Sequence, residues 1–289
     1  MDQRIIDLYD EYTHKPLTRE VFLNRLATLA GSMTAALAIL PSIEVNMAHA
    51  ATVEVQDARI VTEKVTYQGD GITMSAYLAM PKMDSGSLRK LPAVMVIHEN
   101  RGLNAHIEDV TRRVALAGFI GFAPDALSVF GGAPADADQA RELFSKLDPP
   151  KNLNNFLMGF DYLKTRKACN EKFGCVGFCW GGALANQLAV HMKKLKAAVS
   201  FYGKQPEAVD VAKIKAAVML HYASNDERIN AGIPAYEAAL KASGVDYSVF
   251  TYHNTQHAFH NDTAPTRYNE EAAKLAWGRT IDFFNKELK

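Results

Sequence analysis

Short apolar runs and amphipathic segments alternate along most of this chain. From Leu91 onward, β-branched, aromatic and small apolar residues form short runs at 93–97, 119–123, 173–177, 197–201, 216–221 and 247–252. Segments with apolar positions at helical spacing separate them, at about 105–117, 135–147, 151–167, 181–192, 231–242 and 268–287. Continuous apolar strands with helices between them are typical of a parallel sheet that is covered on both faces. The pattern therefore predicts an α/β fold with a mostly parallel central sheet.

Two further β-rich runs precede this region, at 59–67 and 72–80, and Gly69-Asp70-Gly71 separates them. A glycine-rich turn between two such runs is a strong signal for a hairpin. We expect this hairpin to add antiparallel edge strands to the sheet. A chain of 289 residues can bury a large core, and α/β folds of this size often form one domain.

The first 58 residues differ from the rest. Residues 3–13 and 18–40 are predicted as helices, the second with Thr18 as N-cap, and 41–58 as a linker. We therefore expect an N-terminal helical extension over 1–58 and a catalytic domain over 59–289.

Part of this extension resembles a targeting signal. Residues 26–40 are small and apolar, and Ala48-His49-Ala50 resembles a cleavage site. The preceding Thr18-Arg19-Glu20 resembles a degenerate twin-arginine signal, with Glu20 in place of the second arginine, but several acidic residues lead it. The apolar stretch is shorter than the roughly 20 residues that span a bilayer, so no spanning segment is predicted. A cytoplasmic protein is favoured, and export to the periplasm is the open alternative.

The charged residues balance, with 32 basic and 32 acidic side chains, and nothing indicates nucleic acid as a partner. The three cysteines Cys169, Cys175 and Cys179 lie close together in an odd number, which does not resemble a disulfide framework. A reducing compartment would keep these thiols free.

The segment 173–182, FGCVGFCWGG, places Cys179 in the pattern Gly-x-nucleophile-x-Gly, directly before a predicted helix. A sharp strand-to-helix turn holds such a nucleophile in a strained backbone conformation, and Gly177 and Gly181 leave room for it. The helix N-terminus would favour a thiolate, and the N–H of Trp180 would face an oxyanion. The alternative is a buried inert cysteine, which is the role expected of Cys169 and Cys175.

A thiol nucleophile needs a base, and the base needs an orienting carboxylate. Asp226 follows the strand predicted at 216–221, at the active-site edge of a parallel sheet, and Glu227 is a weaker rival. His257 lies in the loop after the last predicted strand, far enough along to reach Cys179.

His253 and His260 compete with His257 for the role of base, and the three histidines also raise a metal-binding alternative. Their spacings of four and three residues would place them on one face of a helix. The surrounding residues are typical of a loop, however, so we predict no metal site.

The loop after the strand predicted at 93–97 holds Glu99, Asn100 and Arg101. The second oxyanion N–H of an α/β-hydrolase comes from such an early loop, and Asn100 is the candidate donor. Glu99 is a candidate for orienting the thiol and Arg101 for the pocket, with a surface ion pair as the alternative for both.

Five motifs together are specific. They are HENRGLN at 98–104, APD at 123–125, GFCWGG at 177–182, FYG at 201–203 and HAFHND at 257–262. With them the chain resembles the dienelactone hydrolase family of α/β-hydrolases from Arg59 to Leu288. The resemblance implies a cysteine-dependent hydrolase without cofactor, which cleaves a small ester or lactone through an acyl-enzyme. The implied roles fall on Cys179, His257 and Asp226 as triad and on Glu99 as auxiliary residue, and Tyr202 would pack near the nucleophile. His260 and Asn261 are candidates for the substrate pocket, with a bond to Asp262 as the alternative for His260.

Two positions depart from the dienelactone-cleaving members, which carry arginines where this chain has Val129 and Asn261. A bidentate arginine contact to a carboxylate is not replaced by a valine or an amide. The substrate is therefore expected to lack the carboxylate of a dienelactone, unless Arg101 or Arg228 binds it. A catalytically silent binding module is the alternative function, and a homodimer is left open.

Overall fold

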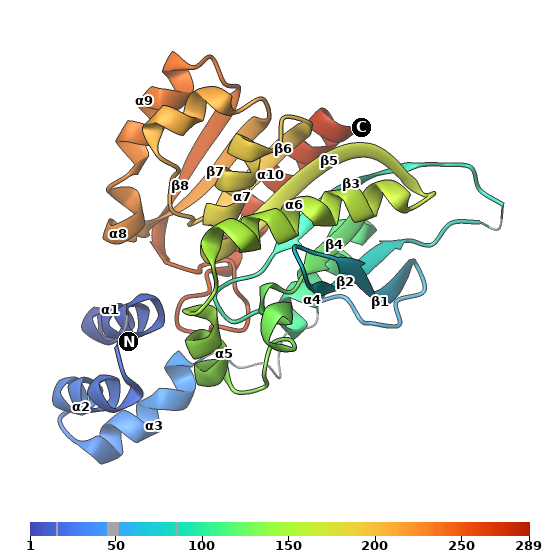
Figure 1. Ribbon diagram of the computed structural model, residues 1–289. Helices are drawn as coiled ribbons and strands as arrows, with labels where there is room; N and C mark the ends of the chain where they lie inside the picture. Colours follow the sequence, from blue (N-terminus) through green and yellow to red (C-terminus); the bar gives the residue numbers. More distant parts are fainter. Residues whose placement is uncertain (16, 45–51, 85) are drawn as a thin grey trace.

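The computed structural model describes residues 1–15, 17–44, 52–84 and 86–289. In these residues an eight-stranded sheet has the order β1-β2-β4-β3-β5-β6-β7-β8 (Figure 1). The strands are β1 (Ile60–Gln68), β2 (Thr73–Pro81), β3 (Leu91–Ile97), β4 (Ile120–Pro124), β5 (Cys169–Phe178), β6 (Leu195–Phe201), β7 (Ala217–Asn225) and β8 (Tyr247–Gln256). Neighbouring strands pair in parallel from β4 through β3 to β8. Strand β2 pairs antiparallel with both β1 and β4. The predicted hairpin and the mostly parallel sheet are confirmed.

The central strands are apolar throughout because both faces of the sheet are covered. Every residue of β3 is buried. Its side chains alternate between two cores: Met95 and Ile97 belong to one, Val94 and Val96 to the other. This period of two is that of a strand between two helical layers.

The helices of these layers lie between the strands in sequence (Figure 1). One core contains side chains of α4 (Ala105–Leu116) and α10 (Glu270–Leu288). The other contains side chains of α5 (Ala137–Phe144), α6 (Pro149–Thr165), α7 (Trp180–His191) and α9 (Ile233–Ala242). Short helical turns lie at η2 (Ala126–Phe130), η3 (Ala208–Lys213) and α8 (Glu227–Asn230).

The helix predicted over 18–40 is wrong as a single element. After α1 (Gln3–His14), it is divided into α2 (Arg19–Ala30) and α3 (Met33–Ile43). Gly31 ends α2 in the left-handed conformation, at φ 85°, and the side chain of Ser32 caps α3 by accepting from the N–H of Ala35. A glycine with positive φ ends one helix and the N-cap that follows begins another, so the apolar run forms two helices instead of one.

The three N-terminal helices have their own core. Tyr12, Phe22, Leu26, Ala36 and Ile43 are among its buried residues. No single helix in the described ranges is long and apolar enough to cross a membrane; α2 and α3 reach that length and composition only as a pair bent by 108°. The expected cleavage-site residues Ala48-His49-Ala50 lie outside the described residues.

Candidate functional site

Cys179 occupies the sharp turn between β5 and α7. Its backbone is in a region that side chains rarely adopt, with φ 55° and ψ −111°. A Cβ on Gly177 would lie 1.9 Å from the carbonyl oxygen of Gly181, and one on Gly181 would lie 2.3 Å from that of Ile97. The two glycines are therefore required by the close approach of α7 to β5 and β3, as the motif predicts.

The environment of Cys179 differs from that of Cys175, two residues earlier. Burial raises the pKa of the Cys179 thiol, but the positive charges of His14 and His257 outweigh this effect and lower the pKa to about 6. Burial raises the pKa of Cys175 well above its usual value. Only a thiolate is a strong nucleophile or metal ligand, and of these two cysteines Cys179 is the one whose surroundings favour the thiolate.

Asp226 and His257 form a buried pair because two neighbouring strands end in register. Asn225 at the end of β7 is paired with Gln256 at the end of β8, so the next residue of each strand lies beside the other. Nδ1 of His257 is 2.5 Å from Oδ2 of Asp226. Burial lowers the pKa of His257, but the negative charges of Cys179 and Asp226 raise it well above its usual value.

The thiol and the imidazole of His257 are near each other. The sulfur of Cys179 and a ring nitrogen of His257 lie within 4.8 Å. Since Nδ1 is bound to Asp226, Nε2 is the free nitrogen, and it has no hydrogen-bond partner among the described residues. Cys179, Trp180, Tyr202 and His257 line one cavity of about 840 Å³, and the ring centroids of Tyr202 and His257 are 5.0 Å apart.

His14, at the end of α1, is a member of this site that sequence reasoning missed. Its Nε2 lies 3.0 Å from the sulfur of Cys179, and its ring meets that of His257 edge-on at 4.8 Å between centroids. Nδ1 of His14 is 2.8 Å from the carbonyl oxygen of Asp10 and 3.2 Å from its carboxylate. Burial lowers the pKa of His14, but the charge of Cys179 and the bond to Asp10 raise it above its usual value.

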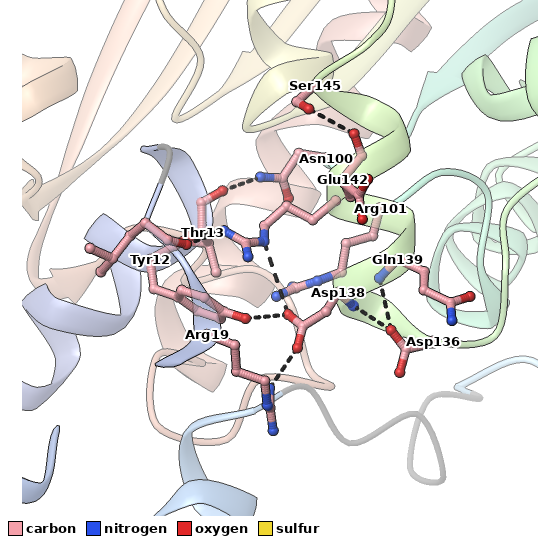
Figure 2. Close-up of polar contacts among 12 residues, drawn as sticks. Tyr12, Thr13, Arg19, Asn100, Arg101, Asp136, Asp138, Gln139, Glu142 and Ser145 are labelled. Atoms are coloured by element: carbon pink, nitrogen blue, oxygen red, sulfur yellow. Dashed lines mark hydrogen bonds and ion pairs between the residues drawn. The ribbon is translucent and has the colours of Figure 1, made fainter. Parts of the chain in front are cut away.

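The segment that carries His14 is anchored to the loop after β3 and to α5 by polar contacts (Figure 2). The side-chain amide of Asn100 donates to the carbonyl oxygen of Thr13 over 2.6 Å. Tyr12 and Arg19 both donate to the carboxylate of Asp138 on α5, over 2.5 and 2.6 Å. The only signal for this docking in the sequence is the apolar spacing of α1, which predicts a packed face but not its partner.

The early loop holds Glu99 and Arg101 in internal contacts. Oε2 of Glu99 accepts from the side-chain amide of Asn261 over 2.7 Å. Arg101 donates to the hydroxyl of Tyr9 over 3.1 Å, so it binds α1 instead of forming the surface ion pair that was the alternative.

Two of the residues expected in the pocket lie elsewhere. His260 is stacked on Phe178, with centroids 5.0 Å apart, and Asn261 is buried; neither lines the cavity of Cys179. His260 does not bind Asp262, whose carboxylate is instead bound by His106 and Arg113. Val129 is 38% exposed and lies on η2. His253 is exposed on β8, so it does not gather with His257 and His260.

The fold and this arrangement define an α/β-hydrolase with a cysteine in the nucleophile turn. The Dienelactone hydrolase family matches residues 74–288. A protein of Escherichia coli (strain K12) named "Putative carboxymethylenebutenolidase" is 30% identical over 249 residues, which cover 81% of this chain and 90% of that protein. A protein of the same name from Methylorubrum extorquens is 30% identical and covers 94% of this chain and 96% of its own length. The chain belongs to the dienelactone hydrolase family.

A solved structure agrees with this assignment. The "Putative Dienelactone Hydrolase" of Klebsiella pneumoniae superposes with a TM-score of 0.71 at 28% identity, over 78% of this chain and 99% of its own. The resemblance inferred from the motifs is thus confirmed, and the chain is a hydrolase.

Proposed function

We propose that this protein hydrolyses a small carboxylic ester or lactone through a thiol ester on Cys179. The observation that carries the proposal is the convergence of a strained, buried thiol with the His257–Asp226 pair. A nucleophile within reach of a base, and a base held by a carboxylate, is the arrangement that acyl transfer requires.

In the first half of the reaction the thiolate of Cys179 attacks the carbonyl carbon, and the carbonyl oxygen becomes an oxyanion. The N–H groups at the start of α7 have no acceptor within the helix, so that of Trp180 is available to the oxyanion, with Asn100 as the second donor. Collapse of this intermediate breaks the C–O bond. His257 gives its proton to the departing oxygen, which leaves as an alcohol or, for a lactone, stays attached as a hydroxyl group.

In the second half a water molecule gives a proton to His257 and attacks the carbonyl carbon of the thiol ester. The C–S bond breaks, the carboxylic acid leaves, and Cys179 returns as a thiolate beside protonated His257. Asp226 holds the tautomer of His257 that keeps Nε2 directed at the reacting atoms.

The chemistry favours esters and lactones over peptides, because an amide nitrogen is a much poorer leaving group. The absence of arginine at positions 129 and 261 favours a substrate without the carboxylate of a dienelactone. The homodimer stays a prediction.

The test is hydrolysis of short-chain aryl esters and uncharged lactones by the wild type and by Cys179→Ala, with Cys175→Ala as the matched control. We expect Cys179→Ala to be inactive and Cys175→Ala to keep wild-type activity. Activity retained by Cys179→Ala would overturn the thiol mechanism. A wild type that turns over no ester and whose thiol is not alkylated in a His257-dependent way would favour the silent binding module.

A further inference from the structure

Three potential metal ligands meet at one point in the structure: the sulfur of Cys179 and one ring nitrogen each of His14 and His257. The three atoms lie within 4.8 Å of one another, and the closest named pair, His14 Nε2 and Cys179 Sγ, is 3.0 Å apart. One thiolate and two imidazoles are the ligand types that zinc prefers. The reaction proposed above uses Cys179 and His257 but gives His14 no task.

The spacing suits a single tetrahedral ion. Zinc bonds of about 2.3 Å to sulfur and about 2.0–2.1 Å to nitrogen place neighbouring ligand atoms about 3.3–3.7 Å apart. The 3.0 Å between His14 Nε2 and Cys179 Sγ is slightly shorter than these values, and no pair of ligand atoms is more than 4.8 Å apart, so the three atoms are close enough for one ion. His14 is the last residue of α1, and His257 follows the end of β8, so each histidine lies at the end of its element.

Each histidine also has the outer partner that metal-bound histidines need. Nδ1 of His257 faces Asp226 at 2.5 Å, and Nδ1 of His14 faces the carbonyl oxygen of Asp10 at 2.8 Å and its carboxylate at 3.2 Å. Such acceptors hold the proton on Nδ1, which leaves Nε2 of each ring as a lone-pair donor. The two carboxylates and the thiolate make the point between the rings favourable for a dication.

We propose that Zn²⁺ binds between His14, Cys179 and His257. Three protein ligands leave a fourth position open, toward the cavity that all three residues line. The ion would occupy the lone pairs of the sulfur and of His257, so the loaded protein would be unable to carry out acyl transfer. This second consequence rests on the proposed hydrolase function, whereas the binding itself does not.

The test begins with full-length protein freed of metal by a chelator. Zn²⁺ binding is measured by calorimetry, and Co²⁺ is added to a separate sample to record the thiolate-to-cobalt absorption in the near ultraviolet. We expect one ion per chain and a cobalt band that Cys179→Ser abolishes. His14→Ala is expected to weaken zinc binding by at least about 100-fold, and Asp10→Asn by about 10- to 100-fold.

Two variants keep this test decisive. His253→Ala, which removes an exposed histidine of β8, should bind zinc like the wild type. His14→Gln, which retains a polar side chain of similar length, is used if circular dichroism shows that His14→Ala is unfolded. Equal zinc affinity of the wild type and a folded His14 variant would overturn the site, as would the lack of a cobalt band in the wild type.

Activity assays test the proposed zinc inhibition separately from the proposed hydrolase function on which that inhibition depends. We expect the metal-free protein to hydrolyse its ester substrate, zinc to inhibit it, and a chelator to restore it. If the metal-free protein hydrolyses its substrate but binds no zinc, the zinc site is refuted and the proposed hydrolase function is retained. If the cobalt band appears but the metal-free protein hydrolyses no substrate, the proposed hydrolase function is refuted and the metal site is retained.

Discussion

Nδ1 of His257 lies 2.5 Å from Oδ2 of Asp226, and this contact follows from the pairing of two strands. Because β7 and β8 end side by side, each of these residues leaves its strand at the same edge of the sheet. Both side chains are buried, so little water competes for the bond. A carboxylate in this position stabilises the imidazolium and sets its tautomer.

Replacing this carboxylate by its amide is expected to disable the base while leaving the packing nearly unchanged. We predict that Asp226→Asn lowers kcat by about 10²- to 10⁴-fold, because the amide can donate to Nδ1 and so favour the wrong tautomer. Steady-state kinetics on an aryl ester measure the effect. Asp161→Asn, at an exposed position of α6, serves as control and should leave kcat unchanged. A kcat within threefold of wild type would show that His257 does not depend on this pair.

The thiol of Cys179 is expected to react with iodoacetamide at unusually low pH. The groups that face it include His14 and His257, whose positive charges outweigh the effect of burial and lower its pKa to about 6. Since the thiolate is the reactive form, the rate should rise as pH passes upward through about 6, whereas an ordinary thiol titrates at about 8.5. The measurement is the alkylation rate of metal-free protein from pH 4.5 to 9, followed by mass spectrometry of residue 179.

A histidine variant checks the cause of that shift. In His257→Ala one of the two cations is gone, so the midpoint of the alkylation curve should move to higher pH. If the midpoint of the wild type already lies near 8.5, the proposed ion pair is absent.

Much of this molecule could be predicted because the responsible signals are local. The apolar run of β3 is a buried strand because both of its faces are covered, and the sequence 173–182 predicts a turn whose glycines are required by close backbone contacts. Asp226 and His257 could be placed together because the carboxyl ends of parallel strands share one edge of the sheet.

The contact of His14 with Cys179 could not be predicted, because it joins positions 165 residues apart through the docking of one helix onto another unit. The helical spacing of apolar residues predicts that one face of the helix is packed, but not which surface it packs against. Asn261 shows the same limit on a smaller scale: its position in the motif suggested the pocket, but its amide is turned inward to Glu99. The break of the helix at Gly31 was a local signal, and the continuous apolar run obscured it.

The glycine of the nucleophile turn should tolerate no side chain. A Cβ at position 177 would lie 1.9 Å from backbone of α7, which only a shift of the whole helix could relieve. We predict that Gly177→Ala lowers the free energy of unfolding by about 3 kcal/mol or more. Gly278→Ala in α10 is the matched control: beyond the backbone of its own helix, no atom of the described residues lies within 4 Å of its added Cβ, so it should stabilise the protein by about 0.5–1 kcal/mol. Urea titrations of both variants, followed by circular dichroism, give the two values. Equal stability of the two variants would contradict the close packing of the turn.

Asn261 offers a test of the buried contact to Glu99 through a change of one atom. Its Nδ2 donates to Oε2 of Glu99 over 2.7 Å, while its Oδ1 accepts from the backbone and hydroxyl of Thr263. Asn261→Asp keeps the acceptor for Thr263 but places a second carboxyl group against Glu99. Two carboxylates at this distance cannot both ionise without a large cost, so the folded variant should retain a proton that the unfolded chain loses.

The sign of the resulting pH dependence follows from that proton. A carboxyl group whose pKa is raised in the folded state binds more protons there than in the unfolded chain at neutral pH, so stability falls as pH rises. We predict that Asn261→Asp costs little near pH 4 and about 2–4 kcal/mol near pH 7. Urea titrations at both pH values measure this, with Asn24→Asp on the exposed side of α2 as control. A loss that is equal at the two pH values would mean that Glu99 and residue 261 do not meet in solution as they do here.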